Sequence, residues 1–95
     1  MNNIIKEKII KEVKLLTQAG ECVGIKISND KGLFIQVDYS LNDNLERVKE
    51  YFIELNDVDS DNVYEPCGHY NERVEFGNIE LLIDKIEKYL EYHGI

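Results

Sequence analysis

The sequence has little proline, no long apolar run and no signal-peptide pattern, which fits a small folded protein. It has one proline in 95 residues, and no window approaches the roughly 20 apolar residues that a membrane-spanning helix needs. Its first eight residues mix charged and apolar side chains, whereas a signal peptide needs a continuous apolar stretch. With 43% hydrophobic and 32% charged residues, the composition is typical of a folded soluble protein. We therefore expect one cytoplasmic domain over residues 1–95.

Cysteine is scarce as well, and its spacing does not favour a metal site. Only Cys22 and Cys67 occur, and reduced thiols are the default in the cytoplasm. Together with His69 and His93 they offer four soft ligands, but only Cys67 and His69 form a closely spaced pair. Structural zinc sites use two such pairs. The sequence therefore predicts no zinc site.

A calcium site is not expected either. Residues 57–61 begin like a calcium-binding loop, with acids at the first, third and fifth positions. Asn62 stands where such a loop needs glycine for its sharp turn, and Gly68 stands where a bidentate glutamate should complete the coordination. We expect a protein without metal or cofactor.

Signatures of catalysis and of nucleic-acid binding are missing from the chain. There is no glycine-rich phosphate loop, no serine-centred elbow and no run of basic and aromatic residues. Cys67 and His69 are close in sequence, but no nearby residue is marked as the third group that would hold the histidine against a cysteine nucleophile. Carboxylates are plentiful, but the chain is short for a walled cleft that could raise the pKa of one of them. We expect a non-enzyme that binds neither nucleic acid nor membranes.

Hydrophobic periodicity in the first half predicts a helix followed by a β-hairpin. A helix over 3–19 places Ile5, Ile9, Val13 and Leu16 on one stripe and ends before Gly20. Residues 23–28 and 33–39 then alternate as two strands around a turn at 29–32. Phe34 lies on the otherwise polar face of this hairpin.

The second half is predicted to contain two more helices and one or two short strands. Asp43 begins a capping box for a helix over about 44–55. Residues 62–65 and 73–76 are expected to form short strands, and Asn78 caps a last helix with Ile83 and Ile86 on its apolar side. The expected fold is α+β, in the order α-β-β-α-(β)-β-α, with three helices packed on a small antiparallel sheet of three or four strands.

Negative charge is concentrated in the middle of the chain. Residues 41–66 hold eight acidic and two basic residues, so this window carries −6 of the net charge of −8. On the expected helix, Glu46, Glu50 and Glu54 are spaced by four and form an acidic ridge. Such a surface accelerates association with a cationic partner and repels polyanions.

Tyrosines accompany the acids, and tyrosine beside carboxylates is typical of an interface that contacts basic residues. A place in the core explains some of these rings equally well. The predicted partner-binding residues are the ridge, the loop after it and two tyrosines: Glu46, Glu50, Glu54, Asp57, Asp59, Asp61, Tyr64, Glu65 and Tyr70.

In length, charge, Lys/Asn/Ile-rich composition and opening helix (Met1 to Lys6), the chain resembles the small acidic immunity proteins of bacterial polymorphic toxin systems. Contact-dependent inhibition and Maf-type loci encode such proteins. The resemblance implies a protein that binds a cognate toxin domain, commonly a nuclease with a cationic substrate groove, and blocks it. An RNase of the EndoU type would suit the charge.

Two alternatives stay open on the sequence. One is an acidic adaptor that binds a basic peptide. The other is a structural subunit of a homo-oligomer such as a homodimer, in which Phe34 and an exposed strand pair with a second copy.

Overall fold

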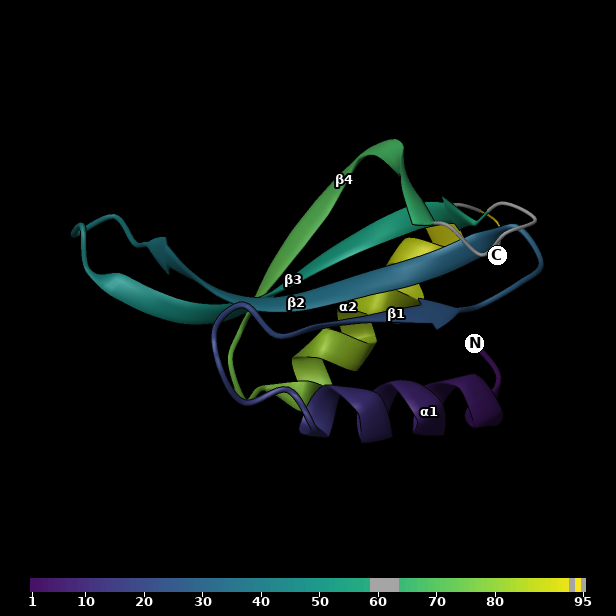
Figure 1. The fold of residues 1–95 in the computed structure, drawn as a ribbon, viewed down its shortest axis with the longest axis horizontal. Coiled ribbons are helices and arrows are strands. Elements are labelled where there is room, and N and C mark those ends of the chain that lie inside the picture. The colour runs from purple at the N-terminus through teal and green to yellow at the C-terminus, as the bar shows by residue number, and fades with distance from the viewer. Residues whose placement is uncertain (59–63, 93, 95) are drawn as a thin grey trace.

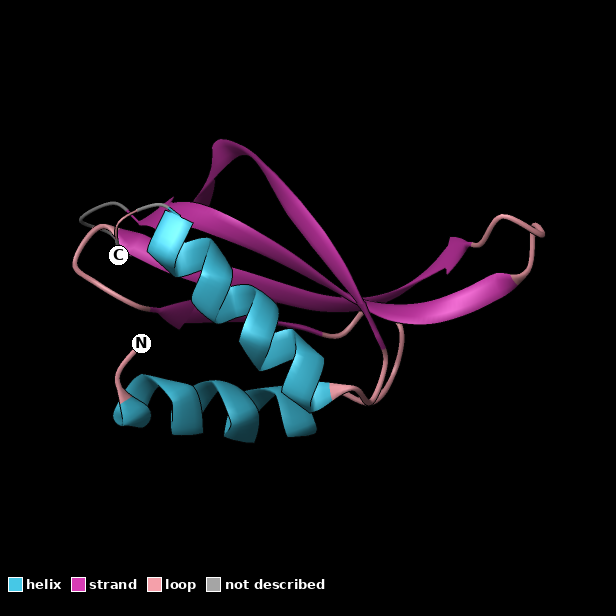
Figure 2. Cartoon of the chain, turned by 180° about the vertical axis from the view of Figure 1, so that it is seen from behind, coloured by secondary structure: helices cyan, strands magenta, loops and turns pink. Residues whose placement is uncertain are grey.

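The fold is α+β, with one antiparallel sheet and a layer of helices on one side of it. The computed structural model describes residues 1–58, 64–92 and 94, with the backbone alone for 64–71. The described residues form α1 (Asn3–Lys14), β1 (Cys22–Lys26), β2 (Lys31–Leu41), β3 (Arg47–Val58), β4 (Tyr64–Glu75) and α2 (Ile79–Tyr92). The strands lie in chain order, β1-β2-β3-β4. Both helices lie on the same side of the sheet, so neither covers its opposite face (Figures 1 and 2).

The hydrophobic core lies between the helices and the sheet. Successive strand residues point to opposite faces, and one face of every strand supplies buried side chains. The most buried core residues are Ile9, Val13, Ile25, Leu33, Ile35, Val37, Tyr51, Ile53, Leu55, Val74, Leu82, Ile86, Tyr89 and Leu90. Each large apolar side chain buried in this way contributes about 1.5–3 kcal/mol. In the described part of the chain, no helix is long and apolar enough to cross a membrane.

The predicted helix over 44–55 is wrong, because these residues form a turn and most of β3. The prediction followed Leu45, Val48 and Phe52, which recur at helical spacing. Tyr51 and Ile53 instead alternate with exposed or half-buried neighbours and are both buried. All eleven residues of β2 pair with β3, and this long ladder outweighs the local helix preference. The described residues therefore form two helices and four strands in the order α-β-β-β-β-α.

Helix α1 ends at Lys14, earlier than the predicted 3–19. The Oε1 atom of Glu21 accepts hydrogen bonds from the backbone N–H groups of Thr17 (2.8 Å) and Gln18 (2.7 Å). A continuing helix would need these two donors for its own ladder, so their capture ends it. The same hydrogen bonds lower the pKa of the Glu21 carboxyl. Leu16 stays in the core although it lies beyond the helix.

The last helix begins directly after Asn78, as predicted, and runs to Tyr92. The Oδ1 atom of Asn78 accepts a hydrogen bond from the Leu81 N–H (3.2 Å), which is the expected N-cap, and Ile83 and Ile86 are buried. The strand before it differs, because 64–75 form one strand where two short ones were expected. Residues 62 and 63 of the predicted segment lie outside the described residues.

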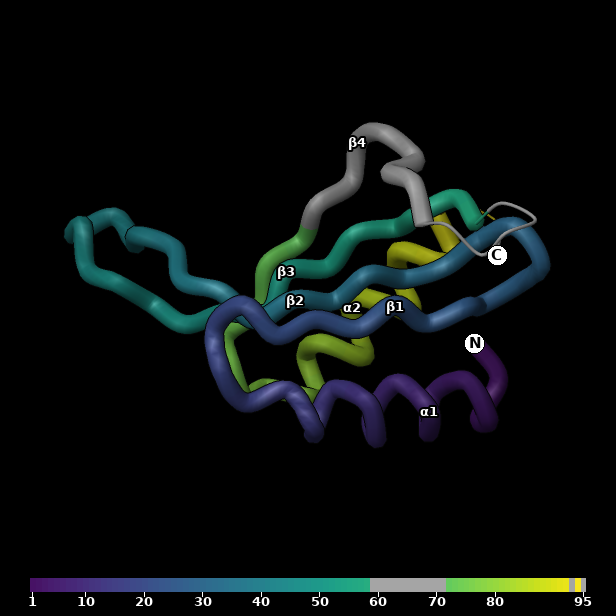
Figure 3. Tube along the Cα trace, viewed as in Figure 1, coloured from purple at the N-terminus to yellow at the C-terminus, as the bar shows by residue number. Residues whose placement is uncertain are grey.

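The far ends of β2 and β3 project beyond the rest of the sheet as a two-stranded arm, residues 39–49 (Figures 1 and 3). Asn42, not Asp43, fixes its turn: the Asn42 Oδ1 atom accepts hydrogen bonds from the N–H groups of Asn44 and Glu46, each at 2.9 Å. The Arg47 guanidinium lies 4.2 Å from the centre of the Tyr39 ring. The arm is therefore held by its own hydrogen bonds and by stacking across its two strands.

Leu45 occupies an unfavourable backbone conformation in this arm. Its φ is +61°, a region that costs a non-glycine residue about 1–2 kcal/mol, and its side chain is 77% exposed. Leu45→Gly should therefore stabilise the protein by about 0.5–1 kcal/mol, after allowing for the entropy that glycine loses on folding. Urea denaturation measures this change, and Leu45→Val should shift the midpoint the opposite way. A destabilised glycine variant would show that the leucine side chain makes a stabilising contact.

Candidate functional site

The sheet face opposite the helices brings together acidic residues that are far apart in the sequence. Asp38 on β2, Glu50 on β3 and Glu75 on β4 are direct cross-strand partners. Partners of this kind have Cβ atoms about 4.5–5.5 Å apart and share one face of the sheet. We call these three residues the acidic row. Asp38 and Glu75 are exposed and Glu50 is half-buried, so the row faces solvent.

The acidic row is an unfavourable arrangement for the isolated protein. Like charges directly opposite each other destabilise a sheet by roughly 0.2–1 kcal/mol for each pair. The Ser40 hydroxyl donates a hydrogen bond to the Glu50 carboxylate, which relieves only part of this repulsion. The nearby Lys49 points to the other face, where its ammonium lies 4.1 Å from the centre of the Phe76 ring. A cationic partner would remove the repulsion.

Beside the acidic row lies a hollow of about 230 Å³, which we call the aromatic hollow. Phe34 and Phe52 are half-buried in it, and the Arg73 guanidinium lies 4.9 Å from the centre of the Phe52 ring. Its remaining lining residues are polar: Gln36, Asp38 and Glu54. The hollow and the acidic row share Asp38, so the two form one continuous surface.

Asn56 positions one carboxylate of the hollow. Only 3% of Asn56 is exposed, and its Nδ2 atom donates a hydrogen bond of 2.9 Å to Oε1 of Glu54. Among the described residues, the Asn56 Oδ1 atom has no hydrogen-bond partner. Because Asn56 is buried at the point where the pairing of β3 with β4 shifts register, its amide holds Glu54 in a fixed place on the sheet.

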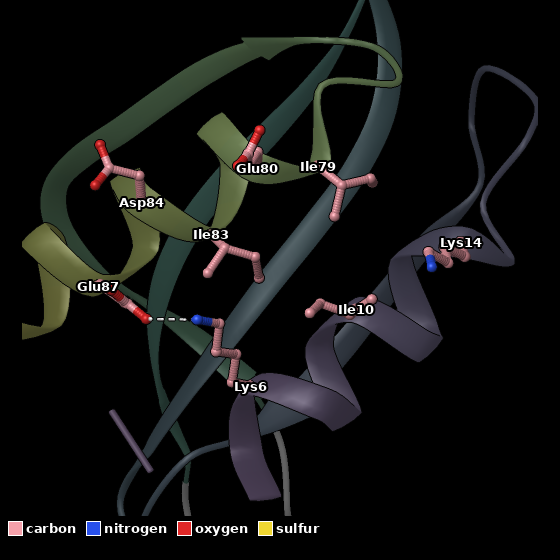
Figure 4. Close-up of a pocket in the computed structure, with 8 residues that line it drawn as sticks. All are labelled: Lys6, Ile10, Lys14, Ile79, Glu80, Ile83, Asp84 and Glu87. Atoms are coloured by element: carbon pink, nitrogen blue, oxygen red, sulfur yellow. Dashed lines mark ion pairs between the residues drawn. The ribbon is translucent and has the colours of Figure 1, made fainter. Parts of the chain in front are cut away.

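A larger groove of about 510 Å³ lies between the two helices (Figure 4). Ile10, Ile79 and Ile83 supply its apolar surface, with lysines from α1 on one side and carboxylates from α2 on the other. Part of this charge is paired within the protein: Lys6 pairs with Glu87 at 3.7 Å across the groove, and Asp84 pairs with Lys88 at 3.1 Å. The groove therefore presents less uncompensated charge than the open face of the sheet.

The structure brings together only part of the predicted partner-binding set. Glu50 and Glu54 lie on the open face of β3, whereas Glu46 belongs to the turn of the arm. Asp57 lies at the opposite end of β3, where its carboxylate pairs with the Lys31 ammonium. The acidic ridge on a helix is therefore wrong, because its three glutamates lie on a strand and a turn.

The rest of that set falls outside what the structure describes. Asp59 and Asp61 lie outside the described residues. Tyr64, Glu65 and Tyr70 have a described backbone in β4, but their side chains are not part of the described structure. Their role at an interface stays a prediction.

Sequence reasoning missed five residues of this surface: Gln36, Asp38, Phe52, Arg73 and Glu75. Phe52 was assigned to the core of a helix. Reading 48–55 as an alternating strand would have placed Phe52 on the same face as Glu50 and Glu54. No local sequence pattern links Asp38 to Glu75, because only the pairing of β2, β3 and β4 brings them together.

Burial raises the pKa of the Tyr51 hydroxyl, and its ring packs 5.2 Å from that of Phe76 on the core side. No group of three or more His, Cys, Asp or Glu side chains in the described ranges could hold a metal ion. What distinguishes the open face is therefore its charge and its aromatic rings. Comparison with protein-family models, curated proteins and solved structures finds no match for this chain.

Proposed function

We propose that this protein is a non-catalytic immunity protein that binds and neutralises a cationic toxin domain through the open face of its sheet. The observation that carries the proposal is the acidic row of Asp38, Glu50 and Glu75. Three carboxylates in direct cross-strand register weaken the fold, and a cationic groove on a partner would convert this repulsion into attraction. The resemblance to polymorphic-toxin immunity proteins points to a nuclease, and an EndoU-type RNase suits the charge.

The geometry of the open face also supports a protein partner over a small substrate. The aromatic hollow, at about 230 Å³, is below the roughly 300 Å³ at which small-molecule sites begin. Aromatic residues and arginine are enriched at the centre of protein interfaces, and the open face carries two half-buried phenylalanine rings with Arg73 over one of them. The surface therefore fits a partner that covers the row and the hollow together.

Glu50→Lys tests the proposal. In the free protein the new lysine lies between Asp38 and Glu75, so the melting temperature should stay the same or rise. Affinity for the toxin domain encoded by the neighbouring gene should fall about tenfold or more, because a like charge then faces the cationic groove. Binding kinetics at several salt concentrations measure this loss, which should appear mainly in the association rate and shrink as salt shortens the Debye length below about 8 Å.

Glu91→Lys is the matched control, because it makes the same charge change on an exposed position of α2. Its affinity should stay close to that of the parent. A Glu50→Lys variant that binds and protects cells as well as the parent would overturn the proposal. Reversal of Asp57, Asp59 and Asp61 to lysine tests separately whether the loop after β3 belongs to the interface.

The arm favours a second candidate function, a homo-oligomeric structural subunit. Tyr39 and Leu41 are exposed on the arm together with Leu45, and exposed apolar residues on an extended ribbon are a surface on which a second copy can pack. Sedimentation of the parent and of Leu41→Asn separates the two functions. If the parent is a dimer and Leu41→Asn is a monomer, the structural subunit is supported. If both proteins are monomers, the immunity function is the remaining candidate.

A further inference from the structure

We infer that the aromatic hollow binds one arginine side chain of the partner, an inference that rests on the proposed function and names the chemistry that the surface recognises. The hollow lies at the edge of the acidic row and is the part of the open face with aromatic walls. Arginine is the basic residue that is enriched at interface centres.

The register of the strands leaves space for a ligand beside Phe34. Its cross-strand partner on β1 is Gly24, and Gly32 precedes it on the same face of β2. Neither residue has a side chain, so no side chain stands directly across from Phe34 on β1 or two residues before it along β2. On its other side Phe34 pairs with Glu54 on β3. A planar group that lies on this ring therefore reaches a carboxylate.

The protein already shows how an aromatic ring of the hollow receives a guanidinium. Arg73 lies over the ring of Phe52 at 4.9 Å, a distance within the range of cation–π contacts. An incoming guanidinium finds Phe34 in the same hollow. The internal pair thus indicates the class of ligand, a flat delocalised cation that stacks on aromatic faces.

Two carboxylates give the hollow an excess of negative charge. One oxygen of each has a partner within the protein: Oε1 of Glu54 accepts from Asn56, and Oδ1 of Asp38 accepts from the Tyr39 N–H at 2.8 Å. Within the described residues, the second oxygen of each carboxylate accepts no hydrogen bond and is left for a ligand. A guanidinium has five donors in a fixed fork and can meet both oxygens, whereas an ammonium acts as a point charge. The geometry therefore favours arginine over lysine.

The experiment titrates the labelled full chain with N-acetyl-arginine amide and follows its backbone amide resonances. We expect saturable shifts at Phe34, Gln36 and Phe52, with a dissociation constant on the order of 1–10 mM, as suits a single side chain. N-acetyl-citrulline amide has the same shape without the charge and should give no saturable shift. N-acetyl-lysine amide should bind about threefold or more weaker, because it cannot make the forked contact.

Variants locate the site. Glu54→Gln keeps the size of the side chain and should weaken arginine binding about threefold or more, while Glu80→Gln on α2, the matched control, should leave it unchanged. Phe34→Leu should also weaken binding through loss of the stacking surface. The inference is overturned if citrulline binds as well as arginine, or if the Glu54→Gln variant binds arginine as well as the parent does. Shifts confined to other faces of the protein would overturn it too.

Failure of this inference is distinguishable from failure of the proposed function. The arginine titration needs no partner protein, and the Glu50→Lys comparison needs no arginine site. If arginine does not bind but Glu50→Lys still weakens the toxin complex, the arginine site in the hollow is refuted and the interface at the acidic row is supported. If arginine binds but Glu50→Lys has no effect on the complex, the hollow is an arginine site and the toxin interface lies elsewhere.

Discussion

Ile86→Ala should lower the free energy of unfolding by about 2–5 kcal/mol. Ile86 is fully buried on the side of α2 that packs on the sheet, so truncation leaves a cavity that the surrounding strands fill only in part. A domain of this size has roughly 5–15 kcal/mol of total stability, so the variant should lose a large share of it and melt at a clearly lower temperature. Urea denaturation, followed by circular dichroism, measures the loss.

Leu81→Ala is the control for this prediction, because Leu81 belongs to the same helix and is 39% exposed. Its cost should be well below that of Ile86→Ala, since less of its surface is removed from water on folding. Equal effects of the two substitutions would mean that α2 does not pack on the sheet through Ile86.

Tyr89→Phe should lower the free energy of unfolding by about 1–3 kcal/mol. The Tyr89 hydroxyl accepts a hydrogen bond from the Leu55 N–H at 3.1 Å, and both residues are buried. Leu55 lies between Glu54 and Asn56, where the pairing of β3 with β4 shifts register, and the hydroxyl meets a donor at this irregular point. Phenylalanine keeps the ring but leaves that donor buried without its acceptor.

Denaturation measures the cost of Tyr89→Phe, and hydrogen exchange of the Leu55 amide reports the broken contact directly. Tyr39→Phe, at an exposed position on the arm, keeps the ring that Arg47 stacks on and should change stability by less than about 0.5 kcal/mol. Unchanged protection of the Leu55 amide in Tyr89→Phe would show that the hydroxyl is not its acceptor.

Elements with strong local signals could be predicted from the sequence. Asn78 and the apolar stripe through Ile83 and Ile86 predicted the last helix because cap and stripe lie within a few turns of one another. The hairpin of β1 and β2 was predicted for the same reason, since a turn of Asn, Asp, Lys and Gly separates two alternating runs. In both cases the deciding interactions join residues that are close in sequence.

The helix over 44–55 could not be excluded locally, because residues 45–55 carry both periodicities. The long pairing of β3 with β2 favours the strand over the helix. Hydrophobic periodicity within one segment carries no information about such pairing. Glu50 and Glu54 share one face in the structure, as they did on the predicted helix, because residues four apart lie on the same side of both a helix and a strand. Asp38 and Glu75 joined them only through the sheet, so the acidic row could not be predicted.

The order of the strands has a consequence for how the chain folds. Each strand pairs with its neighbour in sequence, so the sheet can form from three successive hairpins. The helices lie at opposite ends of the described chain, and the contact of Lys6 with Glu87 spans nearly its whole length. Loop closure makes such distant contacts slow to form. On the ribosome, therefore, the core face of the sheet stays partly open until α2 has emerged, and α2 completes the core.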